Sequence, residues 1–443
     1  MKYRIAITLL LLALVVSDAD AQSRRERRRE RKEREERIRQ RLNDVPDKRP
    51  QERDRKEDRR DEVVKPKPKK KLEVDYPRST FKDVYRIDVL IPLYLDELVK
   101  NDKPVHKSKI PEKYISGLDF YQGITLAADT LNFRRYKLDI HVHDIANPSK
   151  SIKSLIANKT LDSSDLIIGA VQSSDIAPVA EVAKRNNINF ISALSPSDAD
   201  VRNNPYFTII QPRLQSHCEW IMKKVADKYT KNQIGIFYRA TIPVDESAYS
   251  YLTNILEEND LRKVNCNTIP DSVTLAKAFD STQTNVIVMP ILDDKYAETI
   301  LKNLYKSFPG YDFAVYGMPT WKTMAGIRKP EAFPNVAVYF TAPFYFDVTT
   351  SGAQLLYNSY TNKFNGKPGE LVYRGFETLY WYATLLNDYG TIFNPEMHRN
   401  EKAPFTKFEI KTEWNKKKEE ILYNENQHLY LYRYQSSSYM IEQ

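Results

Sequence analysis

Two short polar segments between Asp165 and Pro196 are the residues best suited to hold a ligand. Gln172 to Asp175 follows the apolar run DLIIGA, and Ser192 to Ser197 follows the apolar run INFI. Serine hydroxyls and the free N–H groups at the start of a helix attract an anion. In an open parallel sheet, ligands collect outside the carboxyl ends of the strands, so the two segments predict a binding site.

A strand, a helix and a second strand must position these segments. The run 165–170 is short, apolar and partly β-branched, and Ile176 to Arg185 carries apolar residues at helical spacing. Two parallel strands joined by a crossover helix almost always form a right-handed unit. A second interpretation stays open, because Ser173, Ser174 and Asp175 are good capping residues and could serve the helix alone.

The same alternation of strands and helices continues over most of the chain and predicts an α/β fold. Runs from Val84 onward give a first doubly wound parallel sheet, and the pattern starts afresh near Phe207. We expect two lobes with a cleft between them. Lobe 1 is expected over 84–209 plus about 345–398, and lobe 2 over 210–344 plus about 399–443. The C-terminal runs FTKFEIKTEW and HLYLYRY are expected to form a closing pair of strands.

The first 21 residues have the order of a signal peptide. Lys2 and Arg4 precede an apolar run over 5–16, and the triplet 19–21 is small enough for cleavage before Gln22. The alternative is a membrane anchor, but the run falls short of the roughly 20 residues that a spanning helix needs. We therefore expect the mature protein in the periplasm.

A charged tail is expected over 22–83. Its first fifty residues, 22–71, hold 23 Lys and Arg against 13 Asp and Glu, whereas the whole chain has a net charge of +9. The basic character therefore belongs to the tail and not to the folded part. The tail is either a solvated spacer or a tether to anionic envelope material such as lipid headgroups or peptidoglycan. A signal peptide argues against nucleic acid as its partner.

The remaining reactive side chains give no catalytic or metal pattern. Cys218 and Cys266 have no metal-type spacing, and either one disulfide or two buried thiols would suit them. His141 and His143 share one strand face without other ligands nearby in the sequence. There is no nucleophile elbow, no glycine-rich phosphate loop and no evident acid–base pair. We expect a protein that is not an enzyme and needs no cofactor.

The runs VLIPLY, GITLAADTLN, HVHDIAN, IIGAVQSSDIAPVAEVA with NINFISALSP, and YFTAPFYFD together resemble a known family. The chain from about Val84 onward is similar to the type I periplasmic solute-binding proteins of the branched-chain amino acid branch. It looks closer still to a Bacteroidota-type subgroup that is often fused to LysM modules. The resemblance implies two lobes that close on a small ligand for an ABC transporter.

The resemblance also implies ligand contacts. In that family a ligand carboxylate is held in the loop after the strand at Ile167, which points to Ser173 and Ser174, and by a group after the next strand, which points to Leu194 and Ser195. Pro196 stands where the family usually has threonine. Trp321 lies where an acidic partner for an ammonium group is expected, and the tyrosine-glycine pair after QIGIFYR is missing.

Aromatic residues remain near the expected cleft. Tyr94 and Trp321 could stack on a ligand, although both could equally be core residues in a chain with 29 tyrosines and 4 tryptophans. Two functions stay open. One is a binding protein that holds an amino acid-like or other polar solute for transport or sensing. The other is an envelope scaffold with a degenerate cleft that docks to peptidoglycan or partner proteins. The sequence does not decide the ligand, the partners or the oligomeric state.

Overall fold

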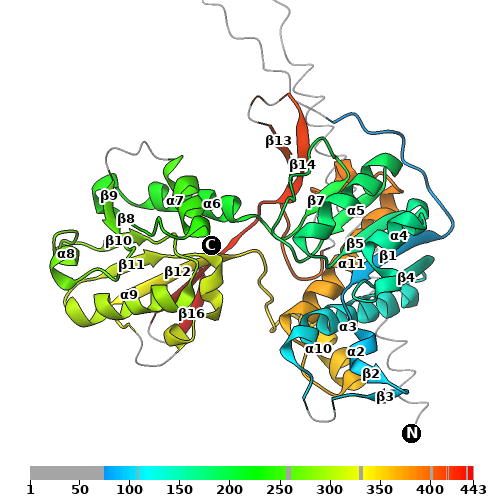
Figure 1. The fold of residues 1–443 in the computed structure, drawn as a ribbon, viewed down its shortest axis with the longest axis horizontal. Helices are drawn as coiled ribbons and strands as arrows, with labels where there is room; N and C mark the ends of the chain where they lie inside the picture. The colour runs from blue at the N-terminus through cyan, green and yellow to red at the C-terminus, as the bar shows by residue number, and fades with distance from the viewer. Residues whose placement is uncertain are drawn as a thin grey trace, which may run out of the picture. The chain divides into compact units, whose positions relative to one another are not determined.

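A computed structural model describes residues 74–106, 109–255, 261–328, 333–399, 403–415, 417, 419–435 and 438–442. The predicted signal peptide and residues 22–73 of the predicted basic tail lie outside these residues. The described chain forms two lobes, each built on its own seven-stranded sheet (Figure 1). The predicted α/β fold with two lobes of parallel sheet is confirmed.

The sheet of lobe 1 has the strand order β13-β14-β7-β6-β5-β1-β4. Its strands are β1 (Tyr85–Ile91), β4 (Leu138–Asp144), β5 (Leu166–Gly169), β6 (Asn189–Ser192), β7 (Phe207–Ile209), β13 (Ile410–Trp414) and β14 (Ile421–Asn426). Neighbouring strands run parallel except for β13 and β14, which are antiparallel. The carboxyl ends of β5 and β6 therefore lie side by side, with Gly169 paired opposite Ser192.

Helices cover both faces of this sheet (Figure 1). The helices of lobe 1 are α2 (Leu95–Leu98), α3 (Glu112–Phe133), α4 (Ile152–Ala157), α5 (Ser173–Asn186), α10 (Ser351–Phe364) and α11 (Glu370–Tyr389), and a short ribbon joins β2 (Val99–Lys100) to β3 (Lys103–Pro104). Of these, α3 and α11 pack on one face of the sheet and α4 and α5 on the other, whereas α10 packs on α3 and α11. Because side chains alternate along a strand, Ile87 and Val89 of β1 pack with α3 and α11, whereas Leu90 packs with α4 and α5. One apolar core therefore lies on each face of the sheet.

Glycines let α3 and α11 pack against each other at close range. A Cβ atom on Gly123 would lie 2.1 Å from the carbonyl oxygen of Val372, and one on Gly375 would lie 2.2 Å from that of Phe120. No side chain fits at either position, because both obstacles are backbone atoms. The position of α11 over the sheet therefore depends on these two glycines.

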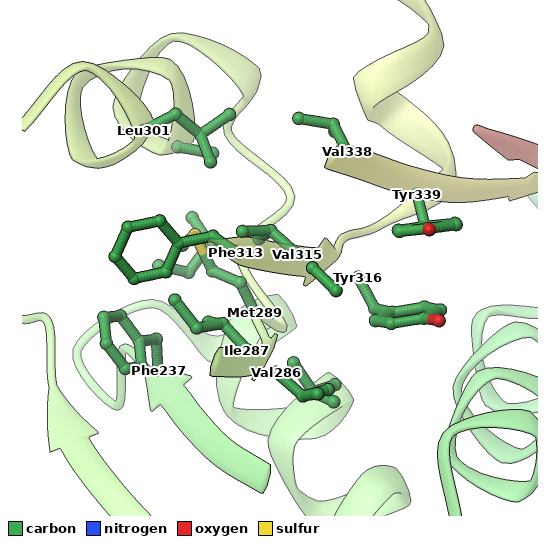
Figure 2. Close-up of a cluster of buried hydrophobic side chains, with 14 of the residues drawn as sticks. Phe237, Val286, Ile287, Met289, Leu301, Phe313, Val315, Tyr316, Val338 and Tyr339 are labelled. Atoms are coloured by element: carbon green, nitrogen blue, oxygen red, sulfur yellow. The ribbon is translucent and has the colours of Figure 1, made fainter. Parts of the chain in front are cut away.

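Lobe 2 repeats the architecture with the order β16-β15-β12-β11-β10-β8-β9. Its strands are β8 (Ile234–Tyr238), β9 (Arg262–Asn265), β10 (Asn285–Val288), β11 (Phe313–Tyr316), β12 (Val336–Ala342), β15 (Tyr430–Gln435) and β16 (Ser438–Glu442), and its helices are α6 (Leu214–Lys228), α7 (Pro243–Thr253), α8 (Ser272–Ala276) and α9 (Asp294–Ser307). Ile287 and Phe313 lie in its apolar core, part of which is shown in Figure 2. Tyr316 and Tyr339 stack there with ring centroids 4.4 Å apart.

The C-terminal strands divide between the lobes, which corrects two predictions. The sequence placed about 399–443 in lobe 2, but β13 and β14 lie in the sheet of lobe 1, where β14 pairs with β7. The expected pairing of FTKFEIKTEW with HLYLYRY is also wrong. β13 pairs with β14 and β15 pairs with β12, so the two runs lie in different sheets. Partner choice here depends on which sheet edge is vacant, and neither run encodes that locally.

Both cysteines are free and buried, so the thiol alternative holds for Cys218 and Cys266. Burial raises the pKa of each thiol to about 12. Within the described ranges, no helix is long and apolar enough to span a bilayer. The same residues contain no group of three or more His, Cys, Asp and Glu side chains placed to hold a metal.

Candidate functional site

The loop after β5 leads directly into α5 and carries the first predicted contacts. Ser173 and Ser174 are the first two residues of the helix and are exposed, and Gln172 occupies the N-cap position. No side chain caps this helix end. The alternative in which these residues only cap the helix is therefore not what the structure shows. The N–H of Asp175 donates to the carbonyl oxygen of Gln172, which leaves the N–H groups of Ser173 and Ser174 for an outside acceptor.

The loop after β6 brings a second hydroxyl to the same place. Ser195 is buried, and its Oγ lies 3.4 Å from the Oγ of Ser173, so either hydroxyl can donate to the other. Ser195 Oγ also accepts a hydrogen bond from the N–H of Ser197 at 3.3 Å. Leu194 is half-buried beside it. The structure thus brings the two predicted serine segments together at the carboxyl edge of the lobe 1 sheet.

Tyr94 lies in the loop after β1, near the carboxyl end of the same sheet. The Asp144 carboxylate at the end of β4 accepts the N–H groups of Leu93 at 2.8 Å, Tyr94 at 3.1 Å and Leu95 at 2.8 Å. These bonds hold Tyr94 in the left-handed region with φ of 57°, which is costly for an aromatic residue. Its half-buried ring packs edge-on against Tyr114 at 5.5 Å. Because these three N–H groups already donate to Asp144, they are not free to bind a ligand.

Trp321 does not face a ligand in this structure. Its side chain is fully buried in the core of lobe 2, and its Nε1–H donates to the carbonyl oxygen of Ile291 at 2.8 Å. The ring lies directly over Gly317, where a Cβ atom would approach it to 2.1 Å. The predicted ligand contact at Trp321 is therefore wrong, and the residue belongs to the core. Burial of the large indole ring is favourable here because its N–H group has a hydrogen-bond acceptor.

Sequence reasoning missed Arg374 on α11. Its side chain is nine-tenths buried, and its Nη2 donates to the carbonyl oxygen of Ala193 at 3.1 Å and to Oε1 of Gln211 at 2.7 Å. The guanidinium carbon lies 3.9 Å from the ring centroid of Phe344. Ala193 immediately precedes Leu194 and Ser195, so this cation lies at the loop that carries the predicted contacts.

Arg374 has no carboxylate within salt-bridge distance among the described residues, although Glu370 and Glu377 of the same helix act on its charge from farther away. Its hydrogen bonds go to neutral acceptors, its Nε is buried without a partner, and no described carboxylate forms an ion pair with it. Burial lowers the pKa of the Arg374 guanidinium to about 10. Arginine is nonetheless charged at neutral pH, and a buried cation is normally paired with an anion.

One signal in the sequence could have found Arg374. It stands in LVYRGFETLYWYATLL, where a single arginine begins a strongly apolar helix. In the structure nearly all residues from Val372 to Leu386 are buried, so any cation in that run must lie inside the lobe. Charged residues in a mostly apolar helix, here Arg374 and Glu377, are therefore a better guide to a buried polar site than aromatic residue type.

Searches against protein-family models and against curated proteins return no match. Solved structures are similar in fold at low sequence identity. A protein from Rhodospirillum rubrum described as a branched-chain amino acid ABC transporter aligns at 11% identity and a TM-score of 0.56, covering 81% of this chain and 99% of that chain. An ABC transporter substrate-binding protein from Desulfitobacterium hafniense in complex with Leu aligns at 13% identity and a TM-score of 0.51, covering 81% and 100%.

The fold is that of the type I periplasmic binding proteins. The same fold occurs in the C-domain of LpoA from Haemophilus influenzae, a regulator of PBP1A, which aligns at 12% identity and a TM-score of 0.54 over 81% of this chain and 100% of that chain. Proteins that bind a solute and a protein that regulates a partner therefore share this architecture. Function must be argued from the site, because fold alone does not decide it.

Proposed function

We propose that this protein is a non-enzymatic periplasmic binding protein that takes a small organic anion between its two lobes, for ABC-type transport or for sensing. The anionic group binds at the carboxyl edge of the lobe 1 sheet, where Ser173, Ser174 and Ser195 lie, which we call the serine edge. In this proposal the hydroxyls of Ser173, Ser174 and Ser195 and the open N–H groups of α5 bind it, with Leu194 and Tyr94 beside it. A carboxylate is the simplest ligand group of this kind.

The observation that carries the proposal is Arg374. A guanidinium that is nine-tenths buried, bonded only to neutral acceptors and placed at the Ala193 carbonyl supplies positive charge next to the serine edge. The helix dipole of α5 adds partial positive charge at the same edge. Asp175 in the first turn of α5 opposes an anion, but burial raises the pKa of its carboxyl, which eases its protonation.

Two features argue against a free α-amino acid as the ligand. The run 318–322 directly after β11 offers no carboxylate for an ammonium group, and its tryptophan, Trp321, is fully buried. Pro196 removes a hydroxyl that an amino acid clamp would use. We therefore favour organic anions without an ammonium group over leucine-like solutes.

Native mass spectrometry of the freshly purified protein tests this function, followed by thermal-shift titrations with acetate, succinate, pyruvate, L-leucine and L-glutamate. We expect at least one anion to raise the melting temperature. Changing Ser173 and Ser174 together to Ala should weaken its binding at least tenfold, since a hydrogen bond to a charged group contributes about 1.5 to 3 kcal/mol. Ser351→Ala, at the exposed start of α10, is the matched control and should leave affinity unchanged.

A protein that carries no small molecule and shows no shift with any of these solutes would contradict the proposal. The scaffold alternative, with docking to peptidoglycan or partner proteins through the basic tail, would then be the remaining function. Pelleting with envelope fractions, comparing the full chain with a form that starts at Leu72, tests that tail directly.

A further inference from the structure

A separate cavity lies on lobe 1 among α3, α10, α11 and the segment 403–405, with a volume of about 780 Å³. It shares no residue with the serine edge or with Arg374. Its walls are mostly apolar and include Leu126, Leu356, Phe376, Tyr380 and Phe405. Sites for small organic ligands have volumes of about 300 to 1,000 Å³ and walls of this composition.

The cavity has aromatic walls and an apolar rim. Phe376 stacks on Tyr380 at 5.6 Å and packs against Phe405 at 5.7 Å. At the rim, Phe133 is 89% exposed and Leu355 is 68% exposed, on α3 and α10 respectively. Large apolar side chains that flank an apolar hollow in this way mark a binding site.

The polar groups of the cavity favour a negative head group. Arg134 places its guanidinium carbon 5.3 Å from the Tyr380 ring centroid, is exposed, and forms no ion pair with a described residue. Lys363 is already neutralised by Asp129, with Nζ and Oδ2 2.6 Å apart. The lining residues thus leave one uncompensated positive charge beside a wall of aromatic and aliphatic carbon.

We propose that this cavity binds one free acyl chain with an acidic head, that is, a long-chain carboxylate. The chain lies against the aromatic walls between α3 and α10, and the carboxylate meets Arg134. A compact hollow of this volume suits one flexible chain. Burial of each methylene group tightens binding about fourfold, so affinity must rise steeply with chain length.

Isothermal titration with dodecanoate and decanoate, both below their micelle concentrations, tests this site on the full chain. We expect one molecule per chain and, for two fewer methylene groups, about fifteenfold weaker binding of decanoate than of dodecanoate. Ser359→Trp, at an exposed lining position of α10, fills the hollow and should abolish binding. Val273→Trp, at a 66% exposed position of α8, is the matched control and should bind normally.

The head group is tested by Arg134→Gln. We expect about tenfold weaker binding of dodecanoate, and no change for decan-1-ol, which lacks the charge. Binding that does not saturate, or binding that Ser359→Trp leaves intact, would overturn the proposal, because it would show that dodecanoate adheres to the surface as a surfactant. The proposal would also be overturned if the protein pelleted with phosphatidylglycerol vesicles but did not bind monomeric dodecanoate. That result would indicate membrane docking instead. Acetate and succinate should not compete, which separates this site from the serine edge.

Discussion

Glu377 on α11 makes the stability of lobe 1 depend on pH. Its side chain is 1% exposed, and its Oε1 accepts the N–H groups of Phe405 at 3.0 Å and Thr406 at 2.5 Å. Its Oε2 is buried without a partner. Burial therefore raises the pKa of this carboxyl from 4.5 to about 7, against the lowering effects of these bonds and of Arg374.

The direction follows from proton linkage. Between the unfolded pKa near 4.5 and the folded pKa near 7, the folded state holds a proton that the unfolded state has lost, so stability falls as pH rises. Because the folded pKa is raised, the contribution is present at low pH and is lost above about pH 7. For these two values the loss between pH 5 and pH 8 is about 2.5 kcal/mol, at 1.36 kcal/mol per unit.

Urea denaturation of the wild type and Glu377→Gln at pH 5, 6, 7 and 8 measures this quantity. The amide cannot titrate, and other titrating groups cancel in the difference between the two proteins. We expect Glu377→Gln to gain about 2.5 kcal/mol relative to the wild type from pH 5 to pH 8. Glu181→Gln, an exposed change on α5, is the control and should show no such trend. A difference that stays constant over this range would refute the reasoning.

Two further predictions concern packing and thiol chemistry. Gly123→Ala and Gly375→Ala should each destabilise the protein by about 3 kcal/mol in urea denaturation, since the new methyl group meets backbone, whereas Gly310→Ala, with nothing within 4 Å, should change little. Equal effects at all three positions would contradict the close helix packing. Cys218 and Cys266 should not react with a thiol reagent at pH 8 when folded, and both should react after unfolding without reductant. Fewer than two thiols in the unfolded chain would contradict the free-thiol state.

The sequence predicted the repeating part of the fold because that part is encoded locally. Each βαβ unit carries its own hydrophobic periodicity, and the right-handed crossover rule then leaves few arrangements. The loops after β5 and β6 were placed correctly for the same reason, since neighbouring parallel strands end at one edge. Ser173 and Ser195 accordingly approach to 3.4 Å.

The rest depends on contacts between distant segments. Arg374 is buried by the loop after β6, by Gln211 after β7 and by Phe344 after β12, and no local pattern brings these together. Trp321 was assigned by residue type, although an aromatic ring suits a core and a ligand face equally. The partners of β13 and β15 depended on which sheet edges the earlier chain had left unpaired.

The division of the last strands between two sheets also constrains how the protein can be made. Until residues 421–426 are available, β7 is an edge strand, and until residues 430–435 are available, so is β12. Because β14 and β15 come from the last residues of the chain, neither sheet is complete until synthesis has almost ended. Exposed edges invite pairing with other chains, so a partly made chain is prone to aggregate. A chain that ends near residue 420 lacks β14, β15 and β16 and leaves an edge exposed on each sheet, so we expect it to be insoluble.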